Sequence, residues 1–198
     1  MSRRVSIDEK RLLEIALGEF ASKSFDEVSV NRIIERAQIS KGSFYYRFSD
    51  KYELYVTLLK LAADAKWEYI SQNVTIPDDR DLFSLFSIQA EAGFAFAQEY
   101  PEYADLAIRF NLERGSQQYE KAKTELYSAD NSGLEKMIDT AYEAGEFSNQ
   151  YSKPFVKSLI SFLFSSFDQM FQDSKEDPQV LIEQLIRCMK YGLSKDRP

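Results

Sequence analysis

The sequence contains no histidine among its 198 residues, and this absence removes several kinds of chemistry. Without an imidazole there is no histidine general base, no Ser-His-Asp triad and no histidine ligand for a metal. The single cysteine, Cys188, cannot close a disulfide within the chain, and its apolar helical context favours a small packed side chain over a nucleophile. No GxGxxG or P-loop motif is present. We therefore expect no enzyme, no metal and no cofactor.

Glycine and proline are also scarce, at seven and five residues, which suits helices joined by short loops. No apolar run approaches the roughly eighteen residues that a membrane-spanning helix needs. The N-terminal segment has arginines but lacks the apolar stretch of a signal peptide. No segment shows the period-two alternation of a half-buried strand. These features predict an all-α, globular and cytoplasmic protein.

The most informative stretch spans residues 28–58 and reads VSVNRIIERAQISKGSFYYRFSDKYELYVTL. Its first part has apolar residues at helical spacing, Val30, Ile33, Ile34 and Ala37, so one face of a short helix is apolar. Ser29 is suited to cap that helix, because its hydroxyl can accept a hydrogen bond from a free backbone N–H. A break of three residues, 38–40, then separates this helix from a second one, which Ser40 is suited to cap.

The second short helix is more polar than a core helix. Only Phe44 and Phe48 are plainly apolar between Ile39 and Leu54, and they lie four residues apart. Burying these two rings leaves the remaining side chains of the helix in solvent. Two short helices joined by a tight turn, with the second facing solvent, are typical of a helix-turn-helix.

This stretch resembles the N-terminal DNA-binding domain of TetR-family transcriptional regulators. The motifs that carry the resemblance are Val30-x-x-Ile33-Ile34-x-x-Ala37, Ile39-Ser40-Lys41-Gly42-Ser43-Phe44-Tyr45-Tyr46, Phe48 and Lys51-x-x-Leu54, preceded by Ile15-Ala16-x-x-x-Phe20. One departure is Gln38, where the family usually has glycine in the turn. If this residue needs a positive φ, a side chain there costs roughly 1 kcal/mol or somewhat more.

The resemblance implies an N-terminal three-helix helix-turn-helix domain followed by a helical ligand-binding and dimerisation domain. We place the first domain at residues 1–51, continuing into a long linking helix over 51–72, and the second at 73–198. Helices are expected over 7–23, 78–100, 101–111, from about 115 to 144 with a break at 131–133, over 153–172 and over 177–193. Ser6 with Glu9, and Asp50 with Glu53, are suited to form capping boxes.

The formal net charge of −7 is unevenly distributed. Residues 1–51 hold 10 basic and 8 acidic residues, a net of +2, and the remaining 147 residues hold 15 and 24, a net of −9. The acidic charge therefore lies outside the predicted DNA-reading unit. Within that unit the cations Arg32, Arg36, Lys41, Arg47 and Lys51 are candidates for contacts with DNA.

The family pattern at matching positions assigns roles to the second short helix. Lys41 donates to a guanine edge or a phosphate, Gly42 permits close backbone approach, and Tyr45 packs on a thymine methyl or donates to a phosphate. The predicted DNA contacts are Ser29, Asn31, Ser40, Lys41, Gly42, Ser43, Tyr45, Tyr46, Arg47 and Lys51.

The helix after Pro154 is apolar on more than one side, whereas the surface helix of a monomer needs one apolar stripe. It is either buried within one subunit or packed against a second copy, and we favour a two-fold dimer built with the last helix. The predicted interface residues are Phe155, Leu159, Phe162, Leu163, Phe167, Leu185 and Met189.

Aromatic residues with a few polar neighbours occupy the central helices. Core packing explains most of them, but the resemblance implies that some line a cavity for a small-molecule effector. The predicted effector residues are Trp67, Phe86, Phe94, Arg109 and Tyr127. The sequence and this resemblance thus predict a ligand-responsive transcriptional regulator, a repressor, which binds a palindromic DNA operator as a homodimer. The alternative is a ligand-binding or protein-interaction module without specific DNA binding.

Overall fold

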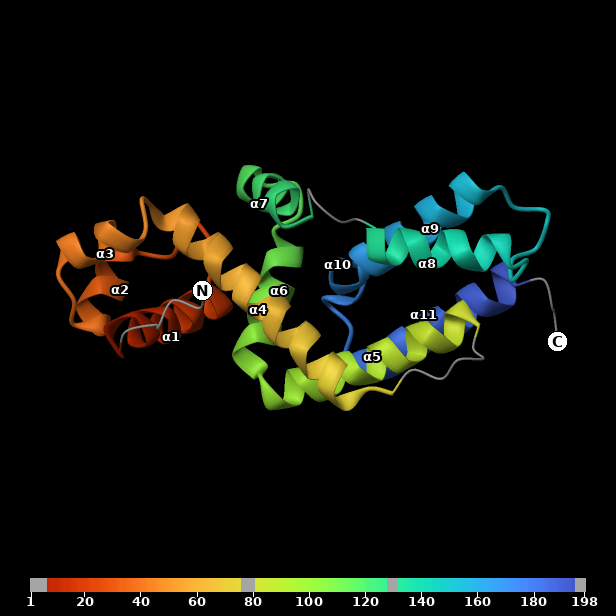
Figure 1. Ribbon diagram of the computed structural model, residues 1–198, viewed down its shortest axis with the longest axis horizontal. Coiled ribbons are helices and arrows are strands. Elements are labelled where there is room, and N and C mark those ends of the chain that lie inside the picture. Colours follow the sequence, from red (N-terminus) through yellow and green to blue (C-terminus); the bar gives the residue numbers. More distant parts are fainter. Residues whose placement is uncertain (1–6, 76–80, 128–131, 195–198) are drawn as a thin grey trace. The chain divides into compact units, whose positions relative to one another are not determined.

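The computed structural model describes residues 7–75, 81–127 and 132–194, and the described residues form eleven α-helices (Figure 1). The helices are α1 (Ile7–Ser22), α2 (Val30–Ala37), α3 (Lys41–Arg47), α4 (Lys51–Asn73), α5 (Leu82–Glu99), α6 (Pro101–Leu112), α7 (Gln117–Tyr127), α8 (Ser132–Glu143), α9 (Lys153–Ser165), α10 (Phe167–Phe171) and α11 (Pro178–Leu193). Outside these helices the described residues include an isolated antiparallel bridge between Phe147 and Ser194.

The chain packs as two compact units. Unit 1 comprises Met1–Trp67 and Glu99–Leu126, and unit 2 comprises Glu68–Gln98 and Tyr127–Pro198. Each unit is therefore built from segments that are distant in sequence, and α4 contributes to both. The division at residues 51 and 73 that we drew from the sequence concerns function and stays a prediction.

Unit 1 has one hydrophobic core, which the helix-turn-helix shares with α6 and α7. Phe20, Phe44 and Leu54 are fully buried in this core, and so are Leu106 of α6 and Ala122 of α7. The apolar spacing of α1, α2 and the start of α4 accounts for the first group. The contribution of α6 and α7 was not predicted, because periodicity identifies an apolar face without identifying its partner.

Caps determine where the short helices begin. The Ser29 hydroxyl accepts from the Arg32 N–H, and the Ser40 hydroxyl accepts from the Ser43 N–H at 3.0 Å, as predicted. At α4 the Asp50 carboxylate accepts from the Glu53 N–H at 2.8 Å. The Glu53 carboxylate reaches one residue further back than predicted and accepts from the Ser49 N–H at 2.6 Å. These bonds satisfy backbone donors that have no partner inside a helix.

The turn between α2 and α3 has the left-handed backbone that the sequence suggested. Gln38 lies at φ 58° and ψ 40°, and its N–H donates to carbonyls of the last turn of α2. It is the non-glycine residue with positive φ among the described residues. A Cβ in this region clashes with the backbone, so this turn holds conformational strain.

Unit 2 has its own core, built from α5, α8, α9 and α11. Phe83 and Phe86 of α5 pack with Ile138, Val156, Ile160 and Ile186, and the Phe86 and Phe164 rings lie 4.7 Å apart. Ser148 N–H donates to the Leu193 carbonyl at 2.8 Å, which ties the loop before α9 to the end of α11.

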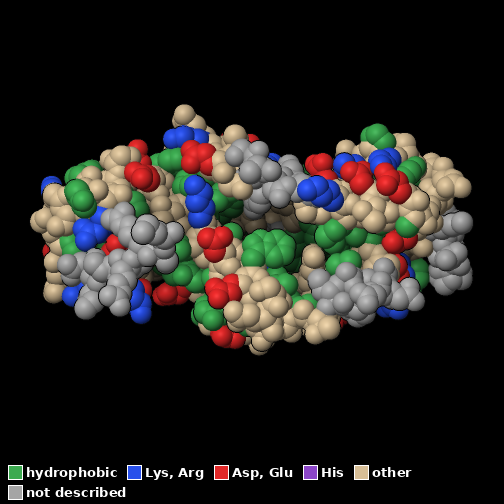
Figure 2. Space-filling view, viewed as in Figure 1, with side chains coloured by type: hydrophobic (Ala, Val, Ile, Leu, Met, Phe, Trp, Pro, Cys, Tyr) green, Lys and Arg blue, Asp and Glu red, His purple; other side chains and the backbone are tan. Residues whose placement is uncertain are grey.

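A ladder of ion pairs joins α8 to α9. Lys157 lies between Glu135 and Asp139 at 3.3 and 3.0 Å, and Lys153 lies between Asp139 and Glu143 at 3.3 and 3.0 Å. Figure 2 shows acidic and basic side chains interleaved over this part of the molecule. Because these lysines pair with α8, the opposite face of α9 carries no charge.

Three predicted helix boundaries differ from the structure. The described part of α5 begins at Leu82 because the Asp81 carboxylate caps it through the Ser84 N–H at 2.7 Å. The helix expected over 153–172 is interrupted at Ser166, which separates α9 from α10. The break expected at 131–133 is wrong at its last two residues, because α8 begins at Ser132 and includes Gly133. The predicted cap at Ser6, the expected start at 78 and residue 131 lie outside the described residues.

Replacement of Gln38 by glycine should stabilise the protein. Glycine adopts positive φ without the Cβ clash, so we expect Gln38→Gly to raise the free energy of unfolding by about 1 kcal/mol in urea titrations. Gln38→Ala is the matched control, because alanine keeps the Cβ and should give no gain. Equal stability of the glycine and alanine variants would contradict the idea of strain at this turn.

Candidate nucleic-acid interface

α3 exposes two tyrosines to solvent, while neighbouring phenylalanines anchor it in the core. Phe44 is fully buried and Phe48, which follows the helix, is 6% exposed, and their rings pack 5.8 Å apart. Tyr45 and Tyr46 are 57% and 84% exposed. Buried aromatic residues thus fix the orientation of α3, and large exposed aromatic residues remain for contact with a partner.

The polar residues at α3 differ in whether their side chains bond to other residues of the chain. The Ser40 and Ser43 hydroxyls lie 3.0 Å apart, and the Arg47 guanidinium donates to the Ser43 carbonyl at 2.9 Å. Gly42 is exposed, and its missing Cβ would meet no atom closer than 3.7 Å. Lys41 is exposed and has no hydrogen bond or ion pair to another described residue. It is therefore the cation of α3 most available to an anionic partner.

The first helix of the pair adds two predicted contact residues. Ser29 serves as the cap of α2, with its hydroxyl turned toward the Arg32 N–H. Asn31, in the first turn of α2, is exposed. The structure thus places the predicted DNA residues on α3, at the N-terminal end of α2 and at the start of α4.

Lys51, at the start of α4, binds the loop that precedes α2. Its ammonium donates to the carbonyls of Phe25, Asp26 and Val28 at 2.8, 3.4 and 3.1 Å. The same nitrogen lies 4.4 Å from the centre of the Phe25 ring. Lys51 therefore ties the start of α4 to the loop between α1 and α2, and a phosphate contact from this residue stays a prediction.

Glu19 of α1 binds three cations, one just after the end of α1 and two on α2. This carboxylate is 3% exposed, yet it accepts from Arg36 at 2.5 Å, lies 3.3 Å from Arg32 Nε and pairs with Lys23. The hydrogen bond from Lys23 is the main cause that lowers the pKa of Glu19, and Arg36 and Arg32 add to it. The carboxylate is therefore ionised at neutral pH. Two of the cations that we selected as DNA contacts are thus already organised within the protein.

Glu19, Phe25 and Glu113 were not among the residues predicted from the sequence. Glu113 accepts the Phe25 N–H at 2.8 Å and so fastens the end of α6 to the loop before α2, and burial raises the pKa of this carboxyl. A signal for Glu19 was available, because it lies beside Phe20 on the apolar stripe of α1, where a charge needs partners. No local signal marks Glu113, since its partner is 88 residues away.

The predicted effector residues do not share one environment. Trp67 is 64% exposed, whereas Phe86 is buried in the core of unit 2 and Phe94 packs against that core. Arg109 is half-buried on α6 in unit 1, where Glu27 and Glu113 act on it electrostatically. The side chain of Tyr127 lies outside the described residues. An effector role for this set stays a prediction.

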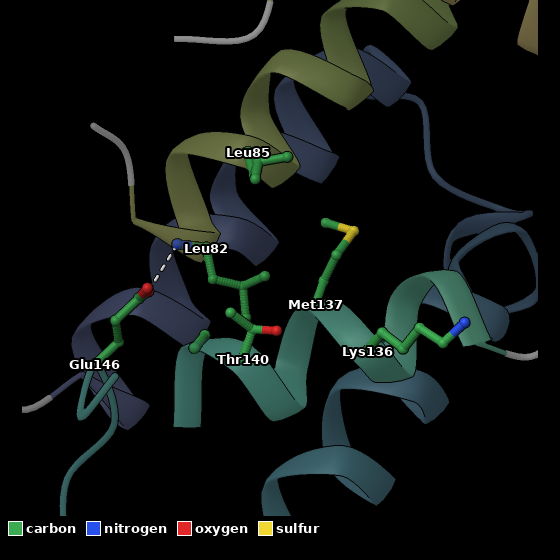
Figure 3. Close-up of a pocket in the computed structure, with 7 residues that line it drawn as sticks. Leu82, Leu85, Lys136, Met137, Thr140 and Glu146 are labelled. Carbon is green, nitrogen blue, oxygen red and sulfur yellow. Dashed lines mark hydrogen bonds between the residues drawn. The ribbon is translucent and has the colours of Figure 1, made fainter. Parts of the chain in front are cut away.

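Unit 2 contains an open cavity between α5 and α8 with a volume of about 320 Å³ (Figure 3). Leu82 and Leu85 line it from α5, and Met137 and Thr140 line it from α8. The Glu146 carboxylate accepts the Leu82 N–H at 2.7 Å at one end. This cavity is of the size that small ligands occupy, although none of the predicted effector residues lines it.

The predicted interface residues fall into two groups. Phe155 and Phe162 of α9 are 49% and 59% exposed, which is unusual for phenylalanine, and they lie two turns apart on one face. The others pack against or within the core of unit 2: Leu159, Leu163, Phe167, Leu185 and Met189. Met189 is 3% exposed, so its side chain packs α11 onto the core of unit 2.

In the described ranges, no helix is both long and apolar enough to cross a lipid bilayer. Nor do the described cysteine and carboxylate side chains form a group of three or more that could hold a metal ion.

Comparison with known proteins identifies the N-terminal segment. Residues 12–58 match the family model of bacterial regulatory proteins of the tetR family. The chain is also similar to the uncharacterized HTH-type transcriptional regulator YuxN of Bacillus subtilis, with 39% identity over 56 residues. That alignment covers 28% of this chain and 19% of the relative's length.

Solved structures resemble the chain over nearly its whole length. A TetR family transcriptional regulator from Chloroflexus aurantiacus aligns with a TM-score of 0.71 at 22% identity, covering 96% of this chain and 94% of that one. The fatty acid degradation regulator FadR of Bacillus halodurans gives 0.71 at 14% identity, covering 96% and 98%. FadR of Bacillus subtilis, in complex with stearoyl-CoA, gives 0.70 at 13%, covering 92% and 98%. At these identities the likeness establishes the fold.

Loss of the Lys51 ammonium should weaken the whole of unit 1. Lys51→Met keeps the aliphatic stem but removes the donor to three carbonyls, so we expect a loss of about 2 kcal/mol in the free energy of unfolding. Urea denaturation followed by circular dichroism measures this loss. Lys60→Met, at an exposed position of the same helix, should leave stability unchanged, and an equal effect of both substitutions would contradict the structural role of Lys51.

Proposed function

Because this chain belongs to the TetR family of bacterial transcriptional regulators, we propose that it is a ligand-responsive repressor that binds a palindromic DNA operator as a homodimer. DNA is then its macromolecular partner, a small molecule is its effector, and the bacterial cytoplasm is its place of action.

The observation that carries this proposal is the exposed face of α3. Tyr45 and Tyr46 project from a helix that Phe44 and Phe48 anchor, and Lys41 lies in its first turn. In a helix-turn-helix the N-terminal part of the second helix meets base edges in the major groove. Lys41 is suited to donate to guanine or phosphate, and the tyrosines are suited to contact thymine methyl groups and phosphates.

The α9 face supports a homodimer. Phe155 and Phe162 expose apolar rings on the side of α9 that faces away from the lysines paired with α8. A second copy related by two-fold symmetry would cover the same face on both subunits. The two identical helix-turn-helix units of such a dimer then favour an operator whose half-sites are inverted repeats.

The cavity in unit 2 supports a small-molecule effector. Its leucine and methionine lining and its volume of about 320 Å³ suit an apolar or amphipathic compound of modest size. A neighbour with the same fold was crystallised with stearoyl-CoA, which supports ligand binding by a helical domain of this type. An effector can release DNA only through different affinities for the two states, and a coupling of about 1–3 kcal/mol changes DNA affinity roughly 5- to 150-fold.

A module that binds ligands or proteins without specific DNA recognition is the alternative. It would keep the fold of unit 2 but would enrich no particular sequence from a pool of duplexes. The exposure of aromatic residues on α3 argues against it, since the rings of Tyr45 and Tyr46 are 57% and 84% exposed.

We expect the protein to enrich a palindrome from a pool of randomised duplexes, and Tyr45→Ala to weaken binding to that site. Loss of one base or phosphate contact in each subunit should lower affinity about 5- to 30-fold, measured by electrophoretic shift. Tyr100→Ala, at another exposed tyrosine of unit 1, is the matched control and should bind as the wild type does. Failure to enrich any discrete sequence would support the alternative.

We expect Phe162→Glu to dissociate the dimer. A carboxylate at the centre of a buried apolar face costs several kcal/mol, so the dimer constant should weaken about 100-fold or more. Sedimentation velocity should then show a species near the chain mass of 23.0 kDa in place of one twice as heavy. Ile108→Glu, at an exposed apolar residue of α6, should keep the dimer; a wild type that sediments as a monomer would refute the homodimer.

A further inference from the structure

We propose that Glu19 is a positioning residue which holds the guanidinium groups of Arg32 and Arg36 together as a binding site for one DNA phosphate. This inference rests on the proposed function and adds to it a site on α2, separate from the exposed face of α3. Glu19 does not itself touch DNA, because it is 3% exposed behind the two arginines.

The contacts leave donors of both arginines for a ligand. Arg32 approaches the Glu19 carboxylate through Nε at 3.3 Å, and Arg36 approaches the same oxygen through Nη1 at 2.5 Å. A guanidinium carries five N–H donors, so each arginine retains several that do not point at this oxygen. Their side chains are 59% and 51% exposed, so these donors can reach an anion from solvent.

The charge balance of the cluster favours an anion. One carboxylate lies against three cations, Arg32, Arg36 and Lys23, which leaves a net charge of +2. Arg11 adds another cation nearby, because its guanidinium donates to the Arg36 carbonyl at 3.4 Å. A single buried carboxylate therefore orients the cations without neutralising them, and a phosphate would complete the pairing.

The position of the pair on α2 suits the phosphate backbone. Arg32 and Arg36 are four residues apart, so they project from adjacent turns of one face of the helix. In a helix-turn-helix the first helix crosses the DNA backbone while the second enters the groove. A guanidinium group that is already held in place loses less side-chain entropy on binding a phosphate than one that rotates freely.

If Glu19 had the opposite role, removal of its carboxylate would change the affinity for DNA in the opposite direction. If the carboxylate merely withdraws the arginines from DNA, its removal adds positive charge and should strengthen binding. If it positions them, its removal should weaken binding even though the net charge becomes more positive. The direction of the change in affinity therefore separates the two roles.

The test measures binding of the full-length chain to a duplex of about 20 base pairs by fluorescence anisotropy over a range of salt concentrations. We expect Glu19→Gln to lower affinity about 3- to 10-fold. We expect the double variant Arg32→Ala and Arg36→Ala to lower it further and to reduce the salt slope by about 1.8, the contribution of one phosphate in each of the two subunits. Adding Glu19→Gln to the double variant should then change nothing, because the side chains that it positions are gone.

Controls keep the outcome decisive. Lys175→Ala removes an exposed cation from unit 2 and should not alter the salt slope. Arg36→Lys keeps the positive charge but loses the planar guanidinium, and we expect it to weaken binding. Because position 36 is half-exposed, this variant still tests the site if circular dichroism shows that Glu19→Gln does not fold. Tighter binding by Glu19→Gln, or unchanged binding by Arg36→Lys and by the double variant, would overturn the site alone. A wild-type chain that binds no duplex at low salt would overturn the proposed function together with the site.

Discussion

The ammonium of Lys51 joins the start of α4 to the loop between α1 and α2, and the helix-turn-helix depends on this contact. It accepts no hydrogen bond and must donate, and the loop before α2 offers it the carbonyls of Phe25, Asp26 and Val28 together with the face of the Phe25 ring. The same loop receives the Glu113 carboxylate of α6 on the Phe25 N–H. This short loop between α1 and α2 is thereby tied to the start of α4 and to the end of α6.

This arrangement explains why α6 and α7 share the core of the helix-turn-helix. Leu106, Phe110, Tyr119 and Ala122 bury apolar area against helices that are too short to form a large core alone. Tyr52 extends the connection, since its hydroxyl donates to Glu125 at 3.0 Å and the Lys121 ammonium lies 3.6 Å from its ring centre. Any movement of α6 or α7 within unit 1 would therefore act directly on the elements that hold α3.

Much of the candidate DNA surface could be predicted from the sequence. Capping at Ser29, Ser40 and Asp50, burial of Phe44 and Phe48, and the left-handed turn at Gln38 all depend on neighbours within a few residues, and the structure confirms each of them. The effector set was harder to predict, because whether an aromatic ring lies in solvent, as Trp67 does, or in a core, as Phe86 does, depends on residues distant in sequence.

The sequence by itself determined the helix-turn-helix, because short-range periodicity, caps and turn residues are local properties of a continuous stretch. It also determined that α9 is apolar on more than one side. Only the tertiary structure decided how the cations are held, since Arg32 and Arg36 lie against the buried carboxylate of Glu19, which belongs to a different helix. A charge pattern gives the sign of a surface, whereas the partners of each charge come from helices that meet only after folding.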